Sequence, residues 1–122
     1  MKRDPDLIRK LLVHLEEKPN DEVITELEFD DYNKIDVMYH FVLMDQAGLL
    51  RCERETSSTT SDRVIRVYPF SLTWQGHEFL EASRNEKLWN KAKELIKQKS
   101  GGLSLDVLKA LLISMAKESV GL

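Results

Sequence analysis

The spacing of apolar side chains predicts a helix near the start of the chain. Its buried face is formed by five residues that recur at intervals of three and four: Leu7, Ile8, Leu11, Leu12 and Leu15. Asp4 stands before Pro5, so a carboxylate can accept hydrogen bonds from the first helical N–H groups while proline takes the first helical position. We expect the helix to end before the turn residues 19–21.

A different period follows in residues 22–29. Leu27 and Phe29 alternate there with Glu26 and Glu28. A period of two is typical of a half-buried strand, so this segment is predicted to be a short strand.

A second helix is predicted from residue 34 to residue 47, ahead of Gly48, which is a common residue just after a helix. Its apolar residues are spread around the helix instead of forming one stripe: Ile35, Val37, Met38, Tyr39, Phe41, Val42, Leu43, Met44 and Ala47. This distribution indicates a helix that is buried on most sides. Only Lys34 and Gln46 are of the types that read base edges, so the helix is a poor base reader.

Two short alternating runs, 50–55 and 63–68, flank a Ser/Thr-rich tip at 56–62 and predict a β-hairpin. On the first strand Leu50 and Cys52 are expected to face inward, and on the second strand Ile65 and Val67. Cys52 is interpreted as a small buried residue and not as a reactive thiol, because the adjacent Glu53 would raise its pKa.

Three helices are predicted after the hairpin. Thr73 can cap the first of them, and Gly76 in its first turn permits a close approach of another backbone. A break near residues 84–85 starts an amphipathic helix whose apolar face is Leu88, Trp89, Ala92, Leu95 and Ile96, and whose opposite face is Arg84, Lys87, Lys91, Lys93 and Lys97.

The last helix follows a turn at 100–102 and is expected to be capped by Ser104. It carries a broad apolar stripe: Leu105, Leu108, Leu111, Leu112 and Met115. This stripe either completes the core of the monomer or pairs with its own copy across a two-fold axis, and the pattern does not decide between the two.

These elements together predict an α+β fold that is mostly helical, with the hairpin as the wing of a winged-helix-like domain. We expect one domain, 1–122, with a core at 1–83 that includes the wing at 49–72, and a C-terminal helical extension at 84–122. The predicted strand at 22–29 departs from the winged-helix pattern, because many such domains carry a second short helix in that position.

Composition narrows the setting of the protein. A chain of 122 residues with a single cysteine cannot form an internal disulfide, and it contains no apolar run near the roughly 20 residues of a membrane span. We therefore expect a soluble, cytoplasmic protein. The net charge of −3 is unevenly distributed, because residues 16–45 carry ten acidic and two basic side chains, whereas residues 84–99 carry six basic and two acidic ones.

Basic side chains are the candidate functional residues. The predicted nucleic-acid contacts are four arginines of the hairpin and three lysines of the following amphipathic helix: Arg51, Arg54, Arg63, Arg66, Lys87, Lys91 and Lys93. Cross-strand Arg and Glu pairs on a solvated face would explain the arginines equally well, and a solvated helix surface would explain the lysines. No spacing of His, Cys, Asp or Glu indicates a metal, a cofactor or a small-molecule site, so we do not expect an enzyme.

Several short runs carry a resemblance to a known family: Met1 to Asp4 with Asp6 to Arg9, Tyr39-His40, Ala47 to Leu49, Leu72 to Trp74, Gly76 to Leu80, and Trp89 to Lys91. The chain resembles the uncharacterised bacterial and phage family known as domain of unknown function 2513. The resemblance implies occurrence in phages or prophages and a winged-helix-like core, and it brings no activity, substrate or catalytic residue.

Two functions remain open from the sequence. One is a small DNA-binding regulator that contacts phosphates through the wing arginines, and this hypothesis rests on analogy of fold. The other is a protein-interaction or homodimerisation module without nucleic-acid binding. Protein contacts do not need a positive surface, and the C-terminal helix is the candidate site of self-association.

Overall fold

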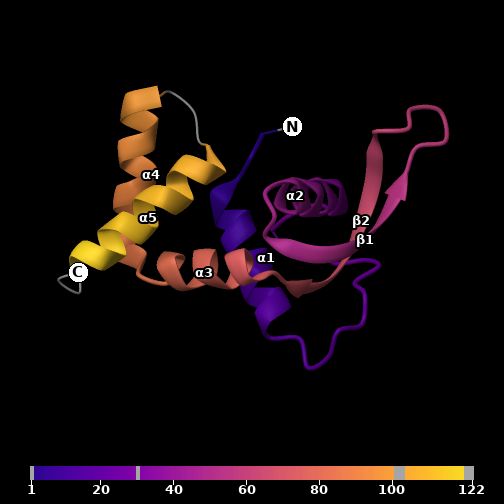
Figure 1. Ribbon diagram of the computed structural model, residues 1–122, viewed down its shortest axis with the longest axis horizontal. Coiled ribbons are helices and arrows are strands. Elements are labelled where there is room, and N and C mark those ends of the chain that lie inside the picture. Colours follow the sequence, from indigo (N-terminus) through magenta and orange to yellow (C-terminus); the bar gives the residue numbers. More distant parts are fainter. Residues whose placement is uncertain (1, 30, 101–103, 120–122) are drawn as a thin grey trace.

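The computed structural model describes residues 2–29, 31–100 and 104–119. The described part contains five helices and one antiparallel hairpin (Figure 1): α1 (Pro5–Glu16), α2 (Lys34–Gln46), β1 (Leu50–Thr56), β2 (Val64–Leu72), α3 (Trp74–Ser83), α4 (Glu86–Ser100) and α5 (Leu105–Ser119). The predicted fold class, α+β and mostly helical, is confirmed, and the order of elements is compatible with a winged-helix-like arrangement.

Helix α1 forms as the sequence predicts. The Asp4 carboxylate accepts hydrogen bonds from the N–H groups of Asp6 at 3.0 Å and Leu7 at 3.2 Å, which caps the helix. The apolar face of α1 is buried and contributes five residues to the hydrophobic core: Leu7, Ile8, Leu11, Leu12 and Leu15.

The prediction of a strand in residues 22–29 is wrong. The Ile24 N–H donates a hydrogen bond to the Pro69 carbonyl of β2 at 2.8 Å, and no ladder follows in the described part of the segment. Proline has no N–H, so Pro69 cannot return the second bond that a regular antiparallel pair would exchange. The alternating Leu27 and Phe29 still pack partly against the core, which explains the pattern without a strand.

The hairpin forms, but the predicted pairing of 50–55 with 63–68 is wrong, because β2 continues to Leu72 and the register contains two β-bulges. Leu50 pairs with Leu72 at one end and Glu55 pairs with Arg66 near the other, while Phe70 and Ile65 of β2 are passed over at the two register shifts. The extra residue at Ile65 changes the alternation of the strand. Val67 is buried as expected, but Ile65 is 45% exposed, so its predicted inward position is wrong.

A close backbone contact joins the hairpin to α3. Thr73 caps α3 by accepting a hydrogen bond from the Gly76 N–H at 3.0 Å, and its own hydroxyl donates to the Gly48 carbonyl at 2.6 Å. A Cβ atom on Gly76 would lie 2.0 Å from the carbonyl oxygen of Leu49. The predicted role of Gly76 is therefore confirmed, because only glycine fits against this carbonyl.

The C-terminal helices share their core with the rest of the molecule. Trp89, Ala92 and Ile96 of α4 and Leu108 and Leu112 of α5 belong to the same buried cluster as the apolar face of α1. The stripe of α5 is thus used inside the monomer at its described positions. Residues 101 and 102 of the predicted turn lie outside the described residues.

We expect Gly76→Ala to lower the free energy of unfolding by about 1–3 kcal/mol, because the added methyl group overpacks a site bounded by backbone. Urea denaturation at neutral pH measures this change. The control is Gln75→Ala, an exposed position of the same helix that should change stability by less than about 0.5 kcal/mol. Equal stability of the two variants would contradict the role given to Gly76.

Candidate functional site

The seven basic residues predicted to contact nucleic acid lie in two separate places. Four arginines belong to the hairpin and three lysines belong to α4: Arg51, Arg54, Arg63 and Arg66, then Lys87, Lys91 and Lys93. In Figure 1 the hairpin and α4 stand at opposite ends of the long axis of the molecule. The two groups therefore do not form one continuous positive face.

Arg54 is held by the end of α2. Its guanidinium donates two hydrogen bonds to the Asp45 carboxylate, at 2.7 Å and 2.6 Å, in the bidentate arrangement that favours arginine. The hydrogen bonds from Arg54 are the main reason why the pKa of Asp45 is lowered, and the same pair raises the pKa of Arg54. Arg54 is therefore committed to a contact within the protein.

The neighbouring Cys52 is half-buried, and the pKa of its thiol is raised, which is the direction expected from the sequence. Burial raises the pKa of its thiol to about 11, and the negative charge of Asp45 acts in the same direction. From the sequence, Glu53 is expected to raise the pKa of the Cys52 thiol. In the structure the charged neighbour that raises it is Asp45.

Arg66 and Arg51 are also in contact with the chain. The Arg66 guanidinium donates to the Thr25 carbonyl at 3.1 Å and lies 5.4 Å from the centre of the Tyr68 ring. Arg51 lies 5.2 Å from the centre of the Phe70 ring. The backbone of Arg63 is hydrogen-bonded to Ser57 and Thr60 of the tip, but its side chain has no hydrogen bond, ion pair or ring contact within residues 2–29, 31–100 and 104–119. Cross-strand ion pairs between Arg and Glu do not occur among these residues either.

Lys93 does not lie on the outer basic face of α4, where the sequence pattern placed it. Its ammonium group donates to both oxygens of Asp6 in α1, at 2.8 Å and 3.0 Å, and its side chain is only 19% exposed. Lys87 and Lys91 are exposed, as predicted. Lys93 belongs to the junction between α1 and α4.

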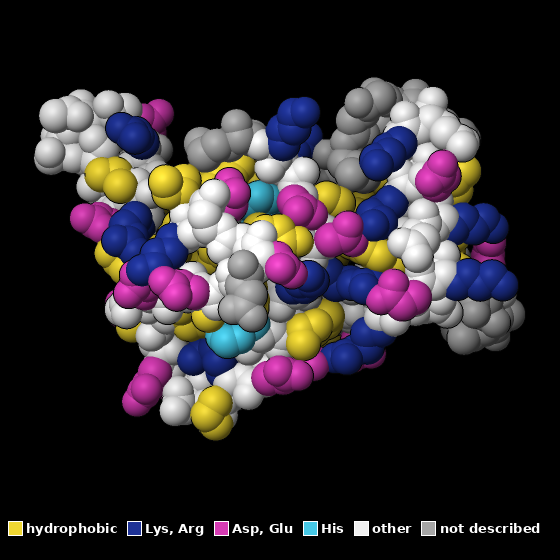
Figure 2. Space-filling view, turned by 180° about the vertical axis from the view of Figure 1, so that it is seen from behind, with side chains coloured by type: hydrophobic (Ala, Val, Ile, Leu, Met, Phe, Trp, Pro, Cys, Tyr) yellow, Lys and Arg dark blue, Asp and Glu magenta, His cyan; other side chains and the backbone are white. Residues whose placement is uncertain are grey.

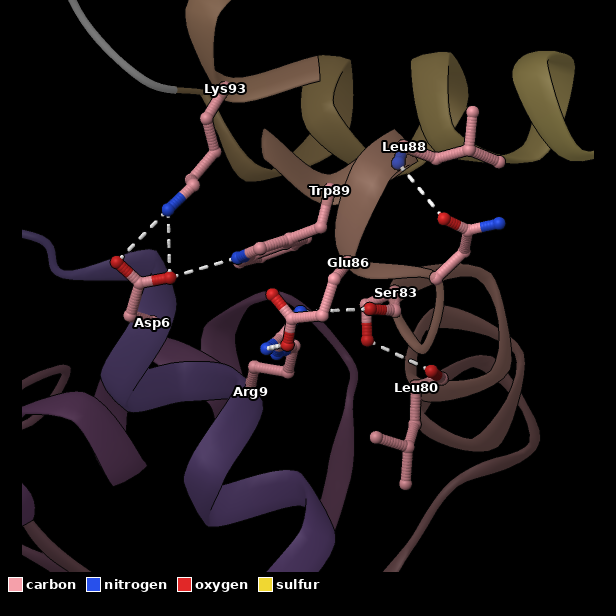
Figure 3. Close-up of polar contacts among 9 residues, drawn as sticks. Asp6, Arg9, Leu80, Ser83, Glu86, Leu88, Trp89 and Lys93 are labelled. Carbon is pink, nitrogen blue, oxygen red and sulfur yellow. Dashed lines mark hydrogen bonds and ion pairs between the residues drawn. The ribbon is translucent and has the colours of Figure 1, made fainter. Parts of the chain in front are cut away.

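That junction is organised around the buried indole of Trp89 (Figure 3). The indole N–H donates to Asp6 at 2.8 Å, and the guanidinium of Arg9 lies 5.0 Å from the centre of the ring. Arg9 also donates to the Ser83 carbonyl at 3.0 Å and forms an ion pair with Glu86. These contacts connect α1 to the start of α4. The polar groups of the junction bind one another.

The carboxylate of Asp6 is stabilised in its charged form. Partial burial raises its pKa, but hydrogen bonds from Lys93 and Trp89, together with the charges of Lys93 and Arg9, outweigh burial and lower the pKa overall.

His40 is a structural residue that the sequence pattern did not identify. It is buried, its Nε2 accepts a hydrogen bond from the Asp4 N–H at 2.8 Å, and its Nδ1 lies 2.7 Å from the Asp36 carbonyl. A carbonyl can only accept, so the two contacts fit the tautomer that carries a proton on Nδ1 and leaves Nε2 as the acceptor. On a helical wheel His40 stands among apolar residues, and the partner that explains it is 36 residues away.

An apolar groove lies between α2 and the start of β2. Helix α2 contributes Ile35, Met38, Tyr39 and Val42, which follow the i, i+3, i+4, i+7 spacing of a second stripe beside the buried Val37, Phe41 and Met44. Most sides of α2 are buried or half-buried, as predicted, and the exception among its apolar residues is Ile35 at the start of the helix, which is 72% exposed.

The opposite wall of the groove comes from the hairpin. Four consecutive residues of the chain, 63–66, line it, together with Glu26 from the segment before α2, and the recess has a volume of about 620 Å³. Figure 2 shows hydrophobic side chains exposed below the tip of the hairpin, at the upper left of that view.

The lining of the groove is positively charged although the chain as a whole is acidic. Lys34, Arg63 and Arg66 are set against the single acidic residue Glu26, which gives a net charge of +2 in a chain of net charge −3. Lys34 is neutralised by ion pairs with Glu26 and, at 3.0 Å, with Glu28. Arg63 is therefore the rim charge that has no partner within the described residues.

A second recess of about 530 Å³ lies where the N-terminal residues meet α2 and α4. It is lined by His40, Asp6 and Lys93, among others. These three polar side chains already bind one another or the backbone, whereas the side chains of Lys2, Arg3 and Lys97, which also line the recess, form no hydrogen bond or ion pair with the described residues.

Comparisons with known proteins agree with the resemblance noted in the sequence. A family model described as "Hypothetical protein (DUF2513)" matches residues 2–102. A protein of Haemophilus influenzae described as "Uncharacterized protein" is 41% identical over 112 residues, which cover 89% of this chain and 90% of that protein. No solved structure matches significantly. Within the described residues, every helix is too short or too polar to cross a membrane.

We expect Asp6→Asn to destabilise the protein at pH 7, and the difference from the wild type to shrink as the pH falls. The folded pKa of Asp6 is lowered, so its contribution is complete above the unfolded value of about 3.9 and is lost as the pH falls through the folded pKa. Urea denaturation from pH 7 to pH 3 measures this effect.

The control for this pH series is Asp21→Asn, which changes an exposed carboxylate in the turn after α1. A constant difference between Asp6→Asn and the wild type at all pH values would contradict the account of the junction.

Proposed function

The chain belongs to the family of domain of unknown function 2513, and within that family we propose that it is a protein-interaction module that binds a partner in the groove between α2 and β2. The observation that supports this function most strongly is the second apolar stripe of α2. One apolar stripe suffices to pack a helix against a core, and α2 has a second one that lines the groove, half-buried at Met38 and Val42 and 72% exposed at Ile35.

The composition of the stripe suits protein recognition. Ile35, Met38 and Tyr39 are of the kinds that fill partner pockets, and methionine adapts to differently shaped ligands. A contiguous exposed apolar patch with a polar rim is typical of an interaction site. Arg63 and Arg66 supply such a rim along one side of the groove.

Self-association through α5 has less support than binding in the groove. Leu108 and Leu112, at the centre of the α5 stripe, are fully buried within the monomer. Val107 is more than half exposed, but a single exposed valine is a small contact for a dimer.

DNA binding is the second candidate, supported by Arg63, Lys87 and Lys91, which are exposed and have no ion-pair partner within the described residues. The placement of these residues weakens the proposal, since the hairpin and α4 lie at opposite ends of the molecule. The outward face of α2 is apolar and offers few side chains that could read bases.

We expect no binding of a random-sequence 25-base-pair duplex in a fluorescence anisotropy titration, even at low salt, because few phosphates could be contacted at once. Binding that weakens steeply with added salt, and is reduced by Arg63→Ala, would instead favour the DNA-binding regulator.

The groove can be tested with peptides selected from a random library displayed on phage. We expect the selected peptides to bind wild-type protein, and Ile35→Glu to weaken their binding at least tenfold, because a charge would be placed in the apolar patch. Isothermal titration calorimetry with the synthesised peptides measures the change.

Trp74→Glu is the matched control for Ile35→Glu. Trp74 is 77% exposed, comparable with Ile35 at 72%, and does not line the groove, so both variants replace an exposed apolar side chain with a carboxylate. If no peptide is enriched, or if Ile35→Glu binds as tightly as the control, the groove is not the binding surface.

A further inference from the structure

We propose that the partner of the groove is an acidic segment of a different protein that binds in extended conformation as an added strand beside β2. This inference rests on the proposed function and specifies the ligand of the same site. It follows from the way β2 lines the groove, from the unpaired backbone of that strand and from the charge of the rim.

The lining residues place the groove at an edge of the hairpin. Residues 63–66 line the groove together with Glu26. The segment that contributes Glu26 lies beside β2, because the N–H of Ile24 binds the carbonyl of Pro69. The edge of β2 that pairs with β1 is occupied, so the groove follows the outer edge.

The outer edge of β2 has unsatisfied backbone groups. In the described part of the chain, the backbone hydrogen bond that reaches this edge is the one from Ile24 to Pro69. Between the tip and Pro69, the outward N–H and C=O groups have no backbone partner outside the hairpin. An exposed strand edge of this kind is a template for pairing with another chain.

The free edge is short, and this bounds the size of the ligand. The bulge at Ile65 interrupts regular pairing on one side, and the contact with Ile24 closes the edge at Pro69 on the other. A few backbone hydrogen bonds would orient the segment. Apolar side chains at alternate positions of the segment would then supply affinity by packing on Met38 and Val42 of α2.

The rim charge selects an acidic partner over a second copy of this chain. Lys34 is neutralised by Glu26 and Glu28, but Arg63 and Arg66 form no ion pair within the described residues, and the Arg63 side chain has no partner there at all. If two copies paired edge to edge, Arg63 and Arg66 of both would be brought together, which is unfavourable. Aspartate or glutamate in the segment would instead pair with Arg63.

The peptides selected on wild-type protein provide the first test. We expect aspartate or glutamate beside alternating aliphatic residues in their sequences. Arg63→Glu should weaken their binding about tenfold, whereas the control Lys87→Glu, an exposed lysine on α4, should leave binding unchanged. Selected peptides that lack acidic residues and ignore Arg63→Glu would overturn the acidic partner.

Methylation of single backbone nitrogens in a selected peptide provides the second test. In an added strand, alternate N–H groups face β2, so methylation of every second position should weaken binding about fivefold to tenfold and methylation of the intervening positions should have little effect. Losses without this alternation, or helix formation on binding seen by circular dichroism, would overturn the added strand.

These outcomes separate the inference from the proposed function. Peptides that depend on Ile35 but fail the charge or alternation tests leave the groove as a binding site and remove its assignment to an acidic extended segment. The absence of any peptide that depends on Ile35 removes both. A doubled solution mass at micromolar concentration that Ile35→Glu abolishes would identify a second copy as the occupant and overturn the inference.

Discussion

The packing of α1 is the constraint on which the rest of the molecule depends. Its leucine face is buried against α2, β2 and α3, while its polar edge is tied to α4 by Asp6 and Arg9 around the indole of Trp89. The hairpin half and the C-terminal helices therefore share one core. Because this core takes up one stripe of α2, the second stripe is left to line the groove with β2.

Several residues on which the family resemblance rests make contacts between different elements of the fold. Asp4 binds His40, Asp6 binds Trp89, and Gly76 lies against the Leu49 carbonyl. Each pair connects elements that are distant in sequence, and each needs a particular side chain or the absence of one. The resemblance therefore describes how the chain folds, and the proposed binding surface lies mostly on other residues.

Periodicity and capping residues predict most of the fold, because helices depend on local signals such as Asp4 before α1 and Thr73 before α3. The errors arise where a distant neighbour decides. Residues 22–29 form no ladder with β2, because Pro69 has no N–H to donate. Ile65 is exposed because a bulge changes the alternation of β2, and Lys93 lies inward because it binds Asp6. The apolar residues spread around α2 are the sequence feature that indicates the groove, but their distribution does not show which side of the helix is exposed to solvent. Likewise, no local pattern reveals that Arg54 is paired with Asp45.

If the groove binds a partner, the second apolar stripe of α2 and the start of β2 form one binding surface. Backbone amide chemical shifts of the isotopically labelled protein, followed by NMR during titration with a selected peptide, test it most directly. We expect the largest shift changes to fall within 34–42 and 63–66. Changes concentrated instead on α4, α5 or the exposed face of α3 around Trp74 would contradict it.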